Sequence, residues 1–285
     1  MKHNDINKDE WDACIDLCIN ALPYAYAWYL DIVADDTWDA IIIDDYKAVF
    51  PLPVKKKFLL PFVYQPFFTQ QLGLFVTDKK YYDLLPDIIN GIPKKFVKIY
   101  LHGNTANAGE NNAQRITHHL SLQNTYETIF HNYGSAVKKN LKATGSKNYT
   151  AVTNISGKIF VQFVKEHVGD KVDVLKEKDF QRLEKLITVC LTKDKGFIRV
   201  VMDAEKNILS AVFMLQAHGY LIYLIAASSG AGRKNQTMTF LIDQIIRDFA
   251  DSQYTFDFEG SMIPGIAHFY KTFGAVEMKF PVFGA

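Results

Sequence analysis

Two acidic residues near the C-terminal end, Asp257 and Glu259, stand two positions apart in the segment FDFEGS. Alternate residues of a β-strand project from the same face, so both carboxylates are expected on one face, with Phe258 in the core. A carboxylate at a strand end can take a proton from an amine, directly or through water. The pattern predicts Glu259 as a general base and makes Asp257 a second catalytic candidate. The alternative is a solvated Glu259 beside an Asp257 that caps or pairs within the sheet.

A tyrosine follows in a short helix that Pro264 begins and Gly274 ends. Tyr270 shares its helical spacing with apolar neighbours, and this pattern by itself favours a core tyrosine. The neighbours are Ile266, Phe269 and Phe273. The other interpretation gives its hydroxyl the chemistry of a general acid that protonates a leaving group.

The segment SSGAGRKNQT, residues 228–237, precedes a long amphipathic helix. Gly230 and Gly232 allow a ligand to approach the backbone closely, and a helix N-terminus favours an anion. Arg233 and Lys234 add positive charge. The segment predicts a phosphate site, with an ordinary tight turn as the alternative.

A second basic group lies in the helix expected over residues 126–143. Lys138 and Lys142 are four positions apart, and like charges at this spacing cost a few tenths of a kcal/mol. Most such runs are solvated faces. The pair mildly favours a phosphate ligand, either the 3′-phosphate of CoA or an RNA backbone.

Composition limits the class of protein. The 285 residues allow two modest domains, and a net charge of +1 argues against a broad, non-specific nucleic-acid binder. Three cysteines, no signal-peptide pattern and no apolar run of about 20 residues predict a cytoplasmic protein without membrane insertion.

The remaining histidines, serines and glutamines provide few candidate functional residues. His118 and His119 are adjacent in an expected strand and face opposite ways, and no His or Cys spacing predicts a metal. No G-x-S-x-G elbow is present. The segment YQPFFTQQLGLF is explained mostly by packing, but Tyr64 and Gln70 could serve an acceptor pocket between the two halves of the chain.

The order of elements divides the chain near Asn124. The second half is expected to contain a strand, two helices, three strands, a long helix, a strand, the Pro264 helix and a last strand. The first half follows this theme less completely and has a turn-rich loop, residues 103–112, in place of that helix. We therefore expect a mixed α/β (α+β) fold of two tandem domains, each a mostly antiparallel central sheet flanked by helices. Residues 1–124 form the degenerate copy and residues 125–285 the complete one.

This order resembles the GNAT acyltransferase fold, and AHFYKTFGA, residues 267–275, resembles the late helix of that superfamily. Two such halves joined by the lysine-rich SAVKKNLKAT, with a late DFEGS, resemble Fem-type aminoacyltransferases. They equally resemble the acetyltransferase domains described as BioF2-like. GNAT enzymes usually open their long helix with a Gln/Arg-x-x-Gly-x-Gly/Ala loop, and the glycine spacing here differs.

The resemblance implies transfer of an acyl group from acyl-CoA to a small-molecule or peptide amine bound between the lobes. Glu259 would be the base and Tyr270 the acid. The 230–234 loop would hold the donor phosphates, helped by Lys138 and Lys142. Two alternatives stay open: Fem-type transfer from aminoacyl-tRNA to a cell-wall precursor, and a catalytically silent binding protein.

Overall fold

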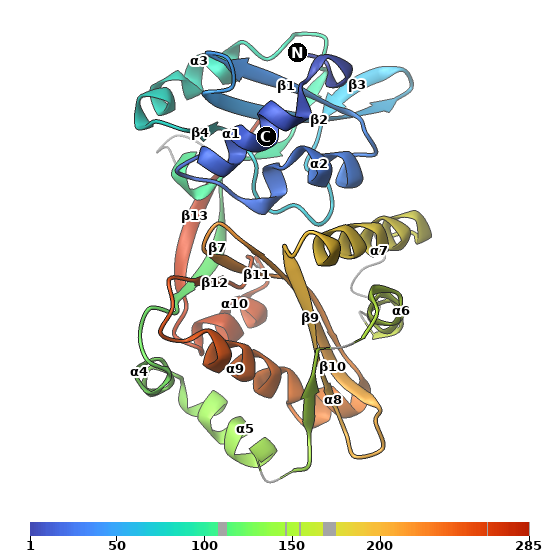
Figure 1. The fold of residues 1–285 in the computed structure, drawn as a ribbon, viewed down its shortest axis with the longest axis vertical. Helices are drawn as coiled ribbons and strands as arrows, with labels where there is room; N and C mark the ends of the chain where they lie inside the picture. The colour runs from blue at the N-terminus through green and yellow to red at the C-terminus, as the bar shows by residue number, and fades with distance from the viewer. Residues whose placement is uncertain (108–112, 146, 154, 168–174, 261, 285) are drawn as a thin grey trace. The chain divides into compact units, whose positions relative to one another are not determined.

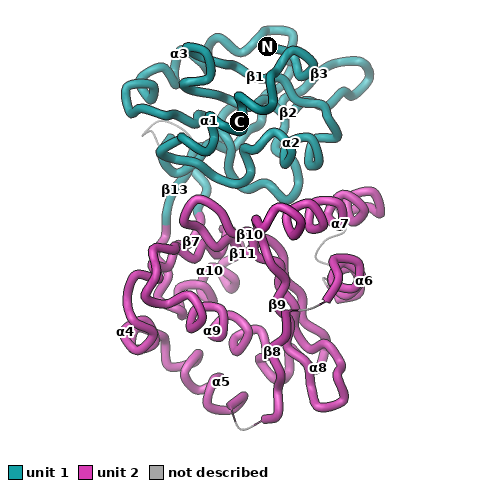
Figure 2. The backbone as a smooth tube through the Cα atoms, viewed as in Figure 1, with its two compact units in different colours: residues 1–116, 278–285 teal, residues 117–277 magenta. Residues whose placement is uncertain are grey.

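The computed structural model describes residues 1–107, 113–145, 147–153, 155–167, 175–260 and 262–284. They form two compact units, residues 1–116 with 278–285, and residues 117–277 (Figure 2). The chain enters the second unit within strand β7 (Ala113–Ser121) and returns within β13 (Val276–Phe283). The division thus falls inside two strands rather than near Asn124.

The return of β13 to the first unit has a packing reason. Val282 and Phe283 pair with strand β6 (Leu101–His102), and the Phe283 ring lies 6.0 Å from that of Phe50. Both phenylalanines are almost fully buried. The hydrophobic core of the first unit is therefore completed by the last strand of the chain.

The sheet of the second unit has the strand order β7-β12-β11-β10-β9-β8 and is antiparallel except for β11 and β12. The tight β10–β11 turn at His218–Gly219 has positive φ at both residues, which matches the twist of a two-residue hairpin. The strands are β8 (Thr150–Val152), β9 (Gly196–Met202), β10 (Ile208–Ala217), β11 (Tyr220–Ser228) and β12 (Thr255–Asp257).

Helices cover both faces of this sheet, with α9 and α10 on one face and α6 and α7 on the other (Figure 1). The apolar stripe of α9 packs on Phe256 and Phe258 in a single core. The helix expected over residues 126–143 is broken in two near Gly134. A short helix also precedes α9 in the segment expected to be a loop, and Gln236 between these two helices has a φ of 57°. The helices are α4 (Tyr126–His131), α5 (Ser135–Gly145), α6 (Gly157–His167), α7 (Glu177–Thr192), α8 (Gly230–Lys234), α9 (Thr237–Phe249) and α10 (Pro264–Lys271).

The first unit contains a sheet of order β1-β2-β3-β5, with β4 also paired to β2. Its helices are α1 (Lys8–Leu17), α2 (Ala27–Val33) and α3 (Leu85–Asn90), and its further strands are β1 (Trp38–Ile43), β2 (Ala48–Lys57), β3 (Leu60–Val63), β4 (Phe75–Val76) and β5 (Lys98–Ile99). In the turn-rich loop, residues 105–107 form a 3-10 turn and residues 108–112 lie outside the described part. No helix within the described ranges is both long and apolar enough to cross a bilayer.

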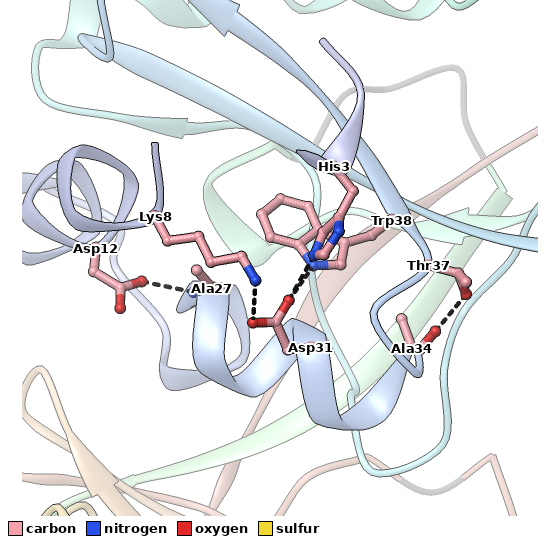
Figure 3. Close-up of polar contacts among 8 residues, drawn as sticks. All are labelled: His3, Lys8, Asp12, Ala27, Asp31, Ala34, Thr37 and Trp38. Atoms are coloured by element: carbon pink, nitrogen blue, oxygen red, sulfur yellow. Dashed lines mark hydrogen bonds and ion pairs between the residues drawn. The ribbon is translucent and has the colours of Figure 1, made fainter. Parts of the chain in front are cut away.

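A half-buried carboxylate joins the N-terminal elements of this unit. Asp31 on α2 accepts hydrogen bonds from Lys8 Nζ at 2.8 Å and Trp38 Nε1 at 2.9 Å, and His3 Nε2 lies at 2.8 Å (Figure 3). The Trp38 ring packs edge-on against Trp11. One side chain thereby connects the N-terminal segment, α1, α2 and β1.

Replacement of Asp31 by Asn should destabilise the protein by about 1–2 kcal/mol at neutral pH. Burial alone would raise the pKa of Asp31, but the donors Lys8, Trp38 and His3 outweigh it and lower the pKa. The charged form is therefore favoured by folding, so this stability is present above the ordinary carboxyl pKa near 4 and is lost as the pH falls through the lower folded value. Urea unfolding between pH 3 and 7 measures this, and a difference independent of pH would contradict it.

Candidate functional site

The candidate site lies where the two parallel strands of the second unit separate. Strands β11 and β12 pair only over Tyr220–Ile222 and Thr255–Asp257. Beyond that point β12 ends, while β11 continues to Ser228 with β10 as its only strand neighbour among the described residues. An unpaired strand edge presents backbone N–H and C=O groups that an extended ligand can bind.

Asp257 closes β12 and is 1% exposed. Its Oδ1 accepts from the Thr117 hydroxyl at 2.5 Å and from the backbone N–H of Glu259 at 2.8 Å. Its Oδ2 lies 3.4 Å from Nε2 of His119, the residue opposite it on β7, without the alignment of a hydrogen bond. Asp257 is thus a buried carboxylate that organises the end of the strand.

Glu259 lies beyond the end of the strand, so the expected alternation does not set its direction. Its φ is 54°, a left-handed conformation that is uncommon for residues other than glycine. The hydrogen bond from its N–H to Asp257 is the i to i+2 contact typical of an Asx turn. The turn leaves Glu259 half-buried. Such strained positions cluster at functional sites.

Tyr270 on α10 packs its ring against aromatic side chains from β7, β11 and the end of β12. The ring centroids of Phe258, His118 and Tyr223 lie at 4.9, 5.7 and 6.3 Å. Burial, and then the negative charges of Glu259 and Asp257, raise the pKa of Tyr270 well above its usual value. The hydroxyl is therefore protonated at neutral pH and stands in the field of both carboxylates.

His118 is a site residue that the sequence did not reveal. It is fully buried, and neither ring nitrogen has a hydrogen-bond partner among the described residues. Burial, and then the charge of Lys271, lower the pKa of His118, which keeps the ring neutral. A buried polar group without a partner needs an explanation, and a bound substrate would supply one. The signal was the adjacent pair of histidines, but its meaning depends on the pairing of β7 with β12.

The glycine-rich segment forms the short helix α8. Ser229 caps it by accepting from the N–H of Gly232 at 3.1 Å. A Cβ on Gly232 would lie 2.0 Å from the carbonyl oxygen of Leu209, whereas a Cβ on Gly230 would meet nothing within 4 Å. The second glycine is thus required by packing on β10, and the first is open to its surroundings.

The basic residues near α8 have different surroundings. Arg233 donates to the Ser228 carbonyl at 2.5 Å, while Lys234 is exposed. On α5, Lys138 donates to the His131 carbonyl at 2.7 Å, and Lys142 is exposed.

Two contacts bring the lysine-rich α5 segment against the junction of α8 and α9. The Nδ2 of Asn140 is 3.4 Å from Oε1 of Gln236, and Lys147 Nζ is 2.5 Å from Oδ1 of Asn235. Both basic groups singled out from the sequence therefore lie in one region of the second unit.

The remaining predicted residues belong to the first unit. Lys55 Nζ lies 4.6 Å from the centroid of the Tyr64 ring, and the side-chain carbonyl of Gln70 accepts from the amide of Gln71. One group with metal-ligand spacing occurs among the described residues: His3, Asp31 and Asp36. The Asp31 oxygens already accept from the Lys8 ammonium and the Trp38 ring N–H, so this group carries no metal assignment.

Comparison with solved structures defines the fold. FemX matches with a TM-score of 0.69 at 14% identity, over 98% of this chain and 96% of that one. The chain has the fold of FemX. L-PGS from Bacillus licheniformis matches with a TM-score of 0.54 at 9% identity, over 98% and 92% of the two chains. A conserved protein of unknown function from Bacteroides thetaiotaomicron matches with a TM-score of 0.56 at 10% identity, over 100% and 98%.

These likenesses confirm the predicted mixed α/β fold class and the predicted resemblance to the Fem-type fold. No protein-family model matches the sequence, and no curated protein does. At identities this low, structural likeness shows the fold and not the reaction.

Proposed function

We propose that this protein transfers an acyl group from acyl-CoA to a small-molecule or peptide amine at the end of β12. The observation that carries the proposal is the convergence of Glu259, Tyr270 and His118 where β11 and β12 separate. A base, a protonated hydroxyl and a neutral buried imidazole are the groups that direct acyl transfer to an amine uses.

The roles follow from the protonation states. Glu259 takes a proton from the acceptor ammonium, and the neutral amine then attacks the thioester carbonyl. The C–S bond breaks as the amide C–N bond forms, and the attacking nitrogen releases its second proton to solvent. Tyr270 donates a hydrogen bond to the departing sulfur. A raised pKa suits hydrogen-bond donation better than full proton release, and the thiolate can be protonated from solvent. His118 offers its nitrogens to a polar group of the substrate.

The donor arm would lie along the free edge of β11. Residues 223–228 span roughly 17 Å from the side of Tyr270 toward α8. The backbone around Gly230 and Gly232, with Arg233 and Lys234, would hold the phosphates, joined by Lys138 and Lys142 of α5. The open space at Gly230, where α8 starts, and the two basic residues in the last turn of that helix support this placement.

A second candidate function is Fem-type aminoacyl transfer from tRNA to a cell-wall precursor. The whole-chain likeness to FemX favours it, because that likeness covers the first unit as well as the second. The exposed Lys139 and Lys142 of α5 would then contact the tRNA backbone.

Donor binding separates the two candidates. Calorimetry with acetyl-CoA and longer acyl-CoAs should give saturable binding that weakens in Lys142→Ala/Lys234→Ala. Lys185→Ala, an exposed lysine on α7, is the matched control. Absence of binding at millimolar acyl-CoA would exclude the first candidate. Filter retention of charged tRNA, lost in the double variant, would establish the second. If neither donor binds, a catalytically silent binding protein is the remaining function.

Tyr270→Phe should lower kcat about 100-fold with little change in KM, because only a hydrogen bond to the leaving sulfur is removed. The ring packing against Phe258 is retained, so the melting temperature should hardly change. Steady-state release of free thiol from acetyl-CoA measures the rate. Tyr254→Phe is the control, since its hydroxyl accepts from Gln216 and takes no part in the proposed chemistry. Equal rates for Tyr270→Phe and wild type would remove Tyr270 from the mechanism.

A further inference from the structure

The apex of the β2–β3 hairpin exposes an unusual group of apolar side chains. Phe58 is 88% exposed, Leu59 91% and Leu60 50%. They directly follow three exposed lysines, Lys55, Lys56 and Lys57. The hairpin extends from the edge of its unit (Figure 1).

The backbone of this turn makes the choice of residues more unusual. Lys57 pairs with Leu60, so Phe58 and Leu59 are the two central residues, with φ of 50° and 65°. Two-residue turns with both central residues left-handed strongly favour Asn-Gly, and bulky side chains are disfavoured there. These side chains therefore weaken the turn while contributing little packing inside the fold. Residues that are disfavoured in their turn and add little to packing indicate a function other than stabilising the fold.

The two chain segments that form the apex and the strand beside it carry only positive charge. Strand β5 pairs with β3 and brings exposed lysines to the same hairpin, with Val97 beside them at 54% exposure. Segments 54–63 and 93–99 together hold six lysines and no acidic residue. Of these lysines, Lys95 forms an ion pair with Asp39 at 3.0 Å. The apex thus exposes apolar side chains that are flanked by lysines.

We propose that this apex, residues 55–60 with Val97 and Lys98, docks the protein on an anionic lipid surface. Phe58 and Leu59 enter the boundary between headgroups and acyl chains, and the lysines bind the lipid phosphates. Peripheral binding of this kind combines buried apolar area with attraction to anionic lipids and needs no spanning segment. A protein partner fits less well, because a stable interface needs on the order of 800 Å² from each side and a two-residue apex offers far less.

Vesicle flotation tests the proposal with wild type and Phe58→Asn/Leu59→Gly. This variant removes the apolar apex but installs the preferred turn sequence, so the hairpin should be retained. Wild type should partition onto phosphatidylcholine vesicles containing about 30 mol % phosphatidylglycerol at least tenfold better than onto phosphatidylcholine alone. The variant should lose about tenfold, and Lys56→Gln/Lys57→Gln a similar factor. Leu17→Asn, at another exposed leucine, should bind as wild type.

Insertion is measured separately with Phe58→Trp, whose emission should be quenched by brominated acyl chains beyond the quenching of wild type. Equal partitioning of wild type on both vesicle types would overturn the proposal. Unchanged binding of Phe58→Asn/Leu59→Gly, or no extra quenching, would do the same. Concentration-dependent self-association that the double variant abolishes, without vesicle binding, would assign the apex to a second copy of the chain instead.

Discussion

Replacing Glu259 by Gln should lower kcat on the order of 10³-fold while leaving the fold unchanged. Gln is nearly isosteric with Glu, and the turn at this position depends on the backbone N–H bound to Asp257, which the substitution keeps. What disappears is the group that takes the proton from the acceptor ammonium. The measurement is thiol release from acetyl-CoA at saturating amine, with circular dichroism to check folding.

The pH dependence gives this prediction a second readout. As the pH rises toward the pKa of the amine, the acceptor loses its proton to solvent and no longer needs a base. The deficit of Glu259→Gln should therefore shrink at high pH, whereas a damaged site would stay slow at every pH. Glu205→Gln is the control, because this exposed carboxylate lies in the turn between β9 and β10, outside the proposed chemistry. An unchanged rate in Glu259→Gln would remove Glu259 as the base.

Gly232→Ala should destabilise the second unit by about 3 kcal/mol. The added methyl group would stand 2.0 Å from the carbonyl oxygen of Leu209, and a backbone oxygen within β10 cannot move aside as a flexible side chain can. We expect a lower urea midpoint with an unchanged slope.

Gly230→Ala is the matched control for this prediction. It lies in the same short helix with open space around its Cβ position, so its effect on stability should stay within about 0.5 kcal/mol. Equal stability of the two variants would show that α8 does not pack on β10 as described. If Gly230→Ala weakens acyl-CoA binding without loss of stability, the effect can be assigned to the donor site.

The sequence predicted the elements whose pattern is local. The stripe of α9, the Pro264 start of α10 and the His218–Gly219 turn each depend on neighbours within a few residues, and all three occur. The short helix α8 was not predicted, because the glycine-rich segment 228–237 has the composition of a turn and the helix spans only 5 residues.

The candidate site depended on contacts that no local pattern encodes. Thr117 and Asp257 are 140 positions apart, and their hydrogen bond depends on the pairing of β7 with β12. Because the sequence does not reveal that pairing, it gives no indication that His118 and His119 lie beside Tyr270 and Asp257. Glu259 was placed by strand alternation, which ends at Asp257 because the chain turns there.

The return of β13 to the first unit has a consequence for how the protein is made. The first 116 residues leave the ribosome early, yet Phe280 and Phe283, both almost fully buried, come from the end of the chain. Until they emerge, His102 and Phe50 lack aromatic neighbours that they have in the finished fold. The core of the first unit therefore cannot be completed until the second unit has been synthesised. Until then, part of that core is exposed to solvent and to chaperones.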